Sequence, residues 1–394
     1  MVVLVIAVAA CASPAAVTTV ATATRTSAPP TAREARRDLP NCGTPLTAIY
    51  AVHVEGVDGG QTGDAIYCAT VGGVHDVNTR LLEWPVAERS LLAADDRILI
   101  QLDVASHGAA AELSTFAPDS GATRTLETLG DLGVGDSGPV GAVMSPDGTE
   151  FALGSAHKLL IVSVDSGAAR TIASAPADRW LMPLRWTAAG IVVHNVDAEP
   201  SDFGLMIIDP LTGSITAVND GPNVQLTVSP DGRYRVSTTN ANLGDGPWTN
   251  FPWQNVIELT GPDGKATRLA SHKDRWFVPL DVTDTGQVLF AVDTENGVVA
   301  PDMGLYMARD GRVTQQLPLH FHDEWQAARF VNGSTALVAH LIGGTGDAQT
   351  GLGLEVVEMC NGVDPGCQPE TSGDTLYSGR WETTIRSLVM LGQS

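Results

Sequence analysis

An internal repeat constrains this chain more than any other feature of its sequence. Segments 178–187 (DRWLMPLRWT) and 274–283 (DRWFVPLDVT) share Asp-Arg-Trp, Pro-Leu and a closing Thr, and 323–332 (DEWQAARFVN) is a weaker copy. Segments 142–153 and 226–237 share Ser-Pro-Asp-Gly between apolar runs. The equivalent points of these copies are Ser145, Thr187, Ser229, Thr283 and Asn332. Their spacings of 42, 42, 54 and 49 residues are typical of a four-stranded propeller blade and predict an all-β chain.

Each repeat contains four strand-like runs separated by turns rich in Gly, Asp and Pro. The complete units cover residues 86–129, 139–173, 180–218, 223–270, 276–317 and 325–377. The region 47–84 has only three such runs, and segment 381–391 (WETTIRSLVML) has the alternation needed to supply the fourth. We therefore predict a β-propeller of four-stranded antiparallel blades, with seven blades closed by the C-terminal strand. Six blades with an irregular cap are the alternative.

The turns give the chain a family resemblance. The Ser-Pro-Asp-Gly turns at 145–148 and 229–232, each preceding an apolar strand, resemble the repeats of TolB-like propellers of the bacterial envelope. The resemblance covers most of residues 47–391 at the level of the blade pattern. It implies an exported protein-interaction module, although no residue matches a contact with the Tol system.

The N-terminus has the features of an export signal. Residues 1–11 form an apolar run, too short to span a bilayer, that ends in Val8-Ala9-Ala10-Cys11. This ending resembles the bacterial lipobox, and the resemblance implies that Cys11 carries lipid. Cleavage at Ala7-Val8-Ala9, which would leave a soluble secreted or periplasmic protein, is the alternative. Residues 12–45 are rich in Ala, Thr, Ser and Pro and are predicted to be a flexible tether before a single propeller domain at 46–394. We therefore expect a protein anchored by lipid on the outer side of the cell membrane.

Four further cysteines also favour export. Cys42, Cys68, Cys360 and Cys367 are an even number, and proximity in sequence favours pairing the first two and the last two in disulfides. Zinc binding is the competing interpretation, but these spacings lack paired C-x2-C motifs.

The charge balance limits the partners. With 23 Lys and Arg against 45 Asp and Glu, the formal charge of −22 argues against binding to nucleic acid. We expect an envelope protein or a glycan as partner, contact with the membrane only through the lipid anchor, no cofactor, and a monomer.

The long insertions of the repeats all fall on one predicted face. They cover residues 196–204, 240–255, 293–304 and 342–353, and loops on a rigid scaffold commonly carry binding. Trp248, Phe251 and Trp253 lie in one of them and are candidates for contacting a ligand or partner. Arg179 and Arg275 of the repeated Asp-Arg-Trp are further candidates on that face. Because they recur with the repeat, packing by the Trp and pinning of the blade corner by the Arg are the favoured interpretation.

One cluster has metal-ligand character. His320, His322, Asp323 and Glu324 offer two imidazoles from one side of a strand plus carboxylates. An exposed polar corner explains the same residues, since no third protein ligand can be placed. Segment 135–139 (GDSGP) resembles the nucleophile region of chymotrypsin-like proteases, but no matching His motif precedes it.

Two classes of function follow. The first is a non-catalytic, lipid-tethered binding or assembly module that uses the long-loop face. The second is a propeller enzyme, such as a lactonase, lyase or glycoside-cleaving hydrolase, with carboxylates or a metal in the central funnel. Three or more His, Asp or Glu side chains converging from different blades would favour the enzyme, whereas a funnel mouth lined by Trp, Phe and Arg would favour binding.

Overall fold

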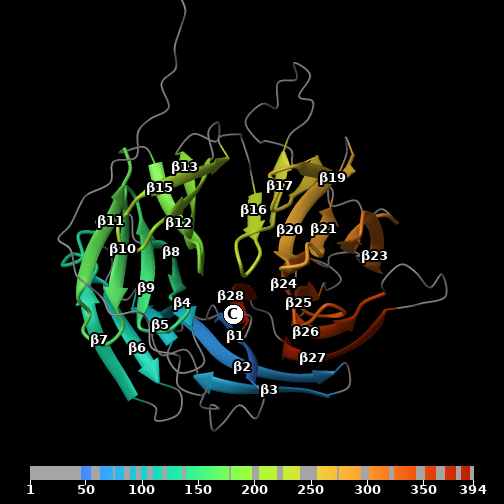
Figure 1. Cartoon of the computed structure of the whole chain (residues 1–394). Coiled ribbons are helices and arrows are strands. Elements are labelled where there is room, and N and C mark those ends of the chain that lie inside the picture. Colours follow the sequence, from blue (N-terminus) through green and yellow to red (C-terminus); the bar gives the residue numbers. More distant parts are fainter. Residues whose placement is uncertain are drawn as a thin grey trace, which may run out of the picture.

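The computed structural model describes eighteen stretches of the chain, and their regular elements are β-strands without an α-helix (Figure 1). The described residues are 46–54, 63–73, 76–83, 89–94, 99–103, 110–117, 122–134, 139–176, 179–197, 204–219, 225–239, 255–272, 275–293, 301–318, 324–342, 351–360, 369–378 and 383–390. Within these stretches, no helix has the length and apolarity needed to cross a membrane.

The strands follow one another along the chain. The first half are β1 (Leu46–Val54), β2 (Gly63–Gly73), β3 (Asp76–Glu83), β4 (Arg89–Ala94), β5 (Leu99–Asp103), β6 (Glu112–Ala117), β7 (Ala122–Thr128), β8 (Pro139–Met144), β9 (Glu150–Ser155), β10 (Lys158–Ser163), β11 (Ala169–Ser174), β12 (Arg179–Thr187), β13 (Gly190–Asp197) and β14 (Gly204–Ile208). The second half are β15 (Ile215–Asn219), β16 (Gln225–Val228), β17 (Arg235–Thr239), β18 (Val256–Thr260), β19 (Ala266–Ser271), β20 (Trp276–Val282), β21 (Val288–Asp293), β22 (Gly304–Arg309), β23 (Arg312–Pro318), β24 (Glu324–Phe330), β25 (Thr335–Ile342), β26 (Gly351–Glu358), β27 (Glu370–Ser378) and β28 (Thr383–Met390).

These strands form seven four-stranded sheets within the described residues. Six sheets consist of consecutive strands: β4–β7, β8–β11, β12–β15, β16–β19, β20–β23 and β24–β27. In the remaining sheet the order is β28-β1-β2-β3, with β28 antiparallel to β1 from Ala48↔Met390 to Val54↔Thr383. The C-terminal strand therefore completes the first sheet, in the place that its sequence predicted.

The sheets are arranged in a ring. The first strand of each sheet contacts the first strand of the next, from β4 through β8, β12, β16, β20 and β24 to β28, and β28 contacts β4 again. Figure 1 shows these strands surrounding the centre of the molecule, with the later strands of each sheet farther out. We call these seven the inner strands. The predicted all-β propeller fold is confirmed.

The hydrophobic core lies between neighbouring sheets. Strand residues alternate in direction, so each sheet presents one set of side chains to the preceding sheet and one to the following sheet. Phe151 packs between β4–β7 and β8–β11, Phe290 between β16–β19 and β20–β23, and Phe330 between β20–β23 and β24–β27. Each of these rings is at most 1% exposed, and complete burial of such a side chain stabilises the fold by about 1.5–3 kcal/mol.

Candidate functional site

The Ser-Pro-Asp-Gly turns place a carboxylate at the end of two strand pairs. Between β16 and β17, Asp231 Oδ1 accepts hydrogen bonds from Ser229 Oγ (2.7 Å) and from the backbone N of Arg233 (2.9 Å). Gly232 has a φ of 76°, in the left-handed region that favours glycine. The turn between β8 and β9 repeats this pattern around Asp147. The motif is therefore a structural turn, and the Asp carboxylate stabilises it by accepting hydrogen bonds from within the turn.

Asp231 also connects two neighbouring sheets. Its backbone N donates a hydrogen bond to Asp284 Oδ1 (2.8 Å), which follows β20. Arg233 Nε donates to the Asp231 carboxylate. Burial acts to raise the pKa of Asp231, but the hydrogen bonds from Arg233 and Ser229 outweigh it and lower the pKa to about 2. Burial and the adjacent Asp231 carboxyl raise the pKa of Asp284. Of the two acids, Asp284 therefore holds a proton more readily.

Three more charged side chains occupy equivalent positions on inner strands. Each lies two residues before the turn that leads to the second strand of its sheet. The side chains are Arg185, Asp281 and Arg329, and the turns begin at Thr187, Thr283 and Val331. Asp281 is 2% exposed, and its Oδ2 accepts a hydrogen bond from the backbone N of Phe330 (2.8 Å). Arg329 Nη1 donates to the carbonyl of Leu280. These contacts tie β20 to β24.

Among the described residues, no hydrogen bond ties Arg185 to a neighbouring sheet in this way. Burial lowers its pKa, while the negative charges of Asp281 and Asp284 act to raise it. Its Nη1 is buried without a hydrogen-bond partner, and so is Asp281 Oδ1. Each such atom costs about 1–3 kcal/mol in unmet hydrogen bonding. The fold thus holds one unused donor and one unused acceptor on interacting side chains.

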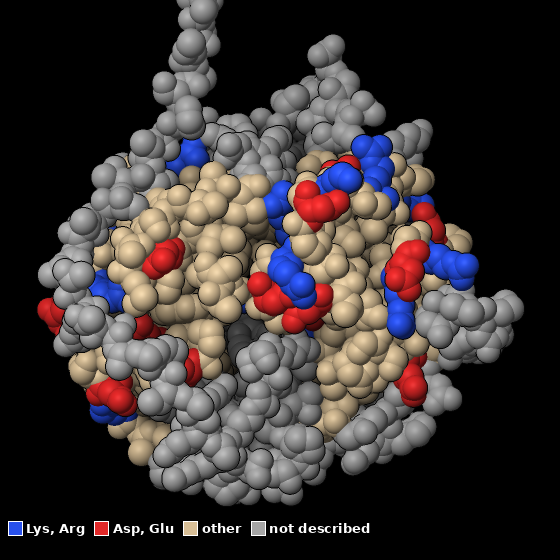
Figure 2. Space-filling model, viewed as in Figure 1, with Lys and Arg blue, Asp and Glu red and all other residues tan. Residues whose placement is uncertain are grey.

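We call Arg185, Asp231, Arg233, Asp281, Asp284 and Arg329 the axial cluster. In Figure 2 red and blue side chains gather beside the hollow at the centre of the molecule, where the turn between β16 and β17 lies. The acids of the cluster come from two sheets, β16–β19 and β20–β23, whereas the arginines come from three, β12–β15, β16–β19 and β24–β27. The cluster thus combines three carboxyl groups with three guanidinium groups, and among the described residues it contains no Trp or Phe.

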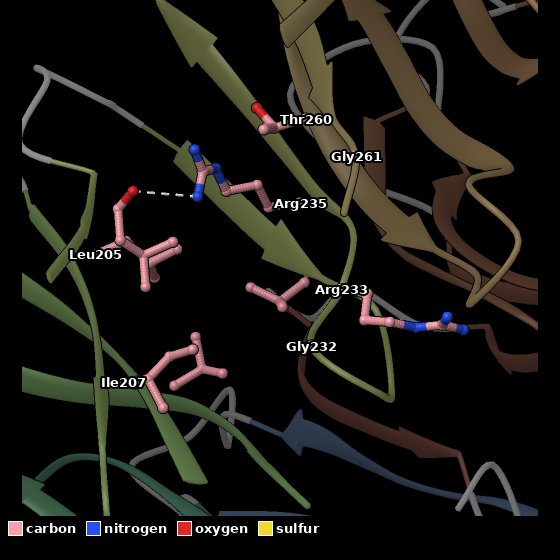
Figure 3. Close-up of a pocket in the computed structure, with 10 residues that line it drawn as sticks. Leu205, Ile207, Gly232, Arg233, Arg235, Thr260 and Gly261 are labelled. Atoms are coloured by element: carbon pink, nitrogen blue, oxygen red, sulfur yellow. Dashed lines mark hydrogen bonds between the residues drawn. The ribbon is translucent and has the colours of Figure 1, made fainter. Parts of the chain in front are cut away.

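A groove separates sheets β12–β15 and β16–β19 (Figure 3). Its apolar walls are Val192, Leu205, Ile207, Val218 and Val228, and its remaining lining is Gly232, Arg233, Arg235, Thr260 and Gly261. In Figure 3 the side chain of Arg235 extends across the groove, and that of Arg233 points away from it. Arg235 Nη1 donates to the carbonyl of Val218 (3.2 Å), which is the hydrogen bond drawn there.

Of the two arginines of the repeated Asp-Arg-Trp, Arg275 forms an ion pair and Arg179 is buried. Arg275 forms a paired ion contact with Asp302, at 2.8 Å (Nε to Oδ2) and 2.7 Å (Nη2 to Oδ1), and this contact lowers the pKa of Asp302. Arg179 begins β12 and is 8% exposed. Trp180 is 43% exposed, so the expectation that the repeated Trp packs between blades is wrong for this copy. Strand alternation is the reason, because Arg179 and Leu181 on either side point inward.

Other predicted residues lie outside the described part of the chain. They are Cys11, Cys42, Trp248, Phe251, Trp253, His320, His322, Asp323 and Cys367. Glu324 is the first residue of β24. Cys68 and Cys360 are buried and disulfide-bonded, and the pairing of the four cysteines stays a prediction. Within the described residues, no group of three or more His, Cys, Asp or Glu could hold a metal ion, and the metal site at 320–324 stays a prediction.

Sequence analysis missed the axial cluster and the groove. The only signal for Asp231 was the Ser-Pro-Asp-Gly motif, which was assigned to a turn. Arg185, Asp281 and Arg329 belong to strand segments whose apolar residues dominate the pattern. The repeat alignment already places Arg185 and Asp281 at one position, but Arg329 joins them only when the hydrogen-bond register aligns Arg185 with Val192, Asp281 with Leu289 and Arg329 with Leu337.

Comparisons with known proteins agree on the fold. No protein-family model and no curated protein sequence matches the chain. Oligogalacturonate lyase in complex with manganese is 13% identical, with a TM-score of 0.52 over 85% of this chain and 85% of that chain. Acylaminoacyl peptidase is 7% identical, with a TM-score of 0.54 over 84% of this chain and 51% of that chain. TolB from Agrobacterium tumefaciens is 12% identical, with a TM-score of 0.40 over 68% of this chain and 88% of that chain. At these identities the likeness concerns the fold alone, and together with the seven four-stranded sheets it shows that the chain is a β-propeller.

Proposed function

We propose that this protein is a non-catalytic binding module of the bacterial cell envelope, and that the axial cluster contacts a glycan. The observation that carries the proposal is the unused buried pair, Arg185 Nη1 and Asp281 Oδ1. A hydroxyl group can accept a hydrogen bond from a guanidinium and donate one to a carboxylate at the same time. A ligand rich in hydroxyls therefore satisfies both atoms without adding charge.

The charge of the cluster supports a neutral ligand over an anionic one. Its three arginines face three aspartates, and Asp231 and Asp281 already accept hydrogen bonds from the protein. An anionic ligand would have to approach these carboxylates, which is unfavourable at short range. A glycan also agrees with the envelope location that the N-terminal sequence predicts.

The binding test uses neutral, soluble glycan fragments, such as oligomers of N-acetylglucosamine, titrated calorimetrically into the propeller. We expect Arg185→Met to weaken binding by about tenfold or more, since hydrogen bonds to a charged group typically contribute about 1.5–3 kcal/mol. Arg268→Met is the matched control, because Arg268 is exposed on β19 and only pairs with Glu258 (3.5 Å). Equal loss in both variants, or no binding by the wild type, would overturn the glycan proposal and leave an envelope protein as the partner to test.

The location rests on Cys11 and the tether at 12–45. Replacing Cys11 with Ser should move the protein from the membrane to the soluble fraction of its host, because a lipid chain cannot then be attached. A wild type that is already soluble, with a mature N-terminus other than Cys11, would contradict the anchoring.

An enzymatic role is the second candidate, and one observation favours it. Asp231 and Asp284 are adjacent carboxyls whose pKa values move in opposite directions, an arrangement that can separate a general base from a general acid. In a glycoside-cleaving hydrolase or lyase, Asp284 would be the proton donor. Asp284→Asn should then abolish turnover of the bound glycan fragments and leave their affinity unchanged. Fragments recovered intact from the wild type would exclude this role.

A further inference from the structure

The groove between β12–β15 and β16–β19 contains an arginine at a core position of the repeat. In four sheets, a residue at or just before the start of the second strand has a carbonyl that accepts the hydrogen bond closing the preceding turn. These residues are Glu150, Tyr234, Gln287 and Thr335. The residues that follow them are Phe151, Arg235, Val288 and Ala336. Phe151, Val288 and Ala336 are 0% exposed and pack against the preceding sheet. Arg235 occupies the position that is hydrophobic core in the other three.

The register confirms which way Arg235 points. Its neighbour Val236 belongs to the core shared with β20–β23, so Arg235 faces the opposite side, toward β12–β15. Arg235 pairs with Val228 on β16 and Thr260 on β18, and both of these line the same groove. The guanidinium is therefore aimed at the apolar wall made by Val192, Leu205 and Ile207.

The guanidinium of Arg235 has no counter-ion within the described part of the chain. It makes one hydrogen bond, from Nη1 to the Val218 carbonyl, and its Nε is buried without a partner. Burial lowers the pKa of Arg235, and no neighbouring carboxylate opposes that effect. Arg233 shows the contrast, because it pairs with Asp231 and points out of the groove (Figure 3).

We propose that this groove binds a small aliphatic carboxylate. The carboxylate would accept charge-assisted hydrogen bonds from Arg235, which planar guanidinium groups form well with carboxylates. The aliphatic part would lie against Ile207 and Val218, the partly exposed apolar residues of the lining. The groove is shallow, with a cavity volume of about 30 Å³ and an opening to solvent, so it would hold the carboxylate and the adjacent carbons while the rest of the aliphatic chain lies along its rim.

The site is separate from the axial cluster, and the inference goes beyond the proposed function. The free acid and the carboxyl-terminal residue of a peptide share this chemistry. Two probes distinguish these sources: 4-methylpentanoate represents the free acid, and N-acetyl-leucine represents the peptide terminus.

The test titrates both probes into the full chain by NMR or calorimetry. We expect the carboxylate probes to bind. 4-Methylpentanamide has the same shape without the charge, and its affinity should be lower by a factor of about ten or more. Arg235→Met should reduce carboxylate binding to the level of the amide. Arg185→Met and Arg268→Met should leave it unchanged, which keeps this test independent of the glycan test.

Equal binding of the acid and the amide would overturn the charged site, and so would an unchanged affinity of Arg235→Met. Absence of binding by the folded wild type would overturn the proposal as a whole. Arg235→Lys guards against a folding artefact, because it keeps the charge and should retain part of the affinity. Tighter binding of N-acetyl-leucine than of 4-methylpentanoate would identify a peptide terminus as the natural ligand.

Discussion

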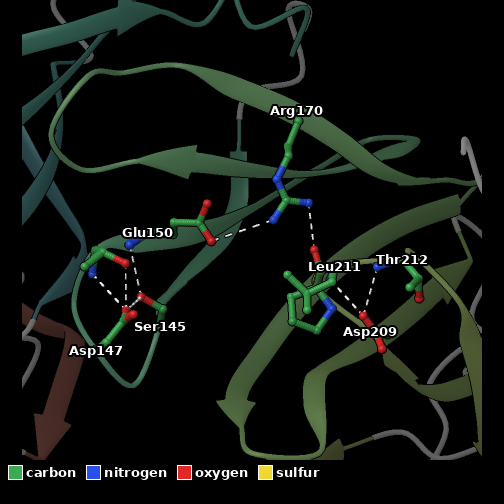
Figure 4. Close-up of polar contacts among 9 residues, drawn as sticks. Ser145, Asp147, Glu150, Arg170, Asp209, Leu211 and Thr212 are labelled. Atoms are coloured by element: carbon green, nitrogen blue, oxygen red, sulfur yellow. Dashed lines mark hydrogen bonds and ion pairs between the residues drawn. The ribbon is translucent and has the colours of Figure 1, made fainter. Parts of the chain in front are cut away.

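Sheet β12–β15 has two neighbours, and its junctions with them are built differently. Toward β8–β11 the junction is closed: Gly154 lies so near Leu181 that a Cβ there would be 2.0 Å from the Leu181 carbonyl oxygen. Ala156 and Trp180 form a backbone bridge between the two sheets. Figure 4 shows Arg170 spanning the same junction, with Nη1 donating to the Pro210 carbonyl (2.7 Å) and Nη2 3.7 Å from Glu150.

Toward β16–β19 the junction is open. Its buried core is only Val192, Leu205 and Val228, against ten buried residues in the closed junction. The equivalent strand position is Ile191 on the closed side and Arg235 on the open side, since each is the second-strand residue facing the preceding sheet. The junctions therefore differ at this repeat position as well as in backbone approach and in the size of their buried cores, so the groove is a property of this unit and not of the fold.

Exchanging the side chains at positions 191 and 235 should have the largest effect on the two junctions. Ile191→Arg would bury an unpaired charge in the closed junction, and we expect the free energy of unfolding to fall by about 4 kcal/mol. Arg235→Ile should instead raise it by up to about 1 kcal/mol and abolish carboxylate binding, because an apolar residue replaces a half-buried charge that has no counter-ion among the described residues. Urea unfolding measures both. Destabilisation by Arg235→Ile equal to that by Ile191→Arg would show that the junctions do not differ as described.

Two glycines, one at each junction, test how closely the neighbouring sheets approach each other. Gly154→Ala places a Cβ 2.0 Å from the Leu181 carbonyl oxygen and 2.4 Å from Pro183 Cδ, and moving the backbone apart should destabilise the fold by about 3 kcal/mol. Gly261→Ala, on the groove, meets its nearest atom, Asp263 Oδ1, at 3.5 Å, so we expect a change within about 0.5 kcal/mol. Similar melting temperatures for the two variants would contradict the difference in closure.

Asp231, in the turn between β16 and β17, should make a smaller contribution to stability that depends on pH. The pKa of Asp231 is about 2 in the folded state against an ordinary 3.8, so its ionised form adds stability above pH 4 that is lost as the pH falls toward 2. Asp231→Asn should therefore lower the free energy of unfolding at pH 7 by roughly 1 kcal/mol, after allowance for solvent screening, and by less at pH 2.5.

Asp284 is the control, because its ionisation should change the free energy of unfolding in the opposite direction. Its pKa is raised, so its ionisation as the pH increases above 4 opposes folding. Asp284→Asn keeps an oxygen to accept the Asp231 N–H and should raise stability at pH 7 by a few tenths of a kcal/mol. Urea unfolding at both pH values decides between these signs. A loss of stability for Asp284→Asn at pH 7 would mean that its charge is compensated by the neighbouring arginines.

Much of the fold could be predicted because the evidence for it is local. The alternation of GIVVHNV and GLMIIDP, the Ser-Pro-Asp-Gly turns and the repeat spacing each occupy a short window, and each constrains backbone dihedrals or strand direction directly. The segment at 381–391 could be assigned to the first sheet because the count of strand-like runs at 47–84 was one short. The strand segment RYRVSTT (233–239) could also be recognised, but its residue pattern does not show that Arg235 lacks a counter-ion among the described residues.

The all-β propeller and the return of β28 to the first sheet could be predicted from residue patterns, since strand periodicity and turn chemistry act over a few residues. Only the tertiary structure decided that Arg185 and Asp281 hold unused hydrogen-bonding atoms, that Asp231 and Asp284 meet across two sheets, and that Arg235 faces an apolar wall. These properties depend on which side chains from separate repeats come within contact distance. The Coulomb and desolvation energies that define such sites are short-ranged in space and have no fixed spacing along the chain.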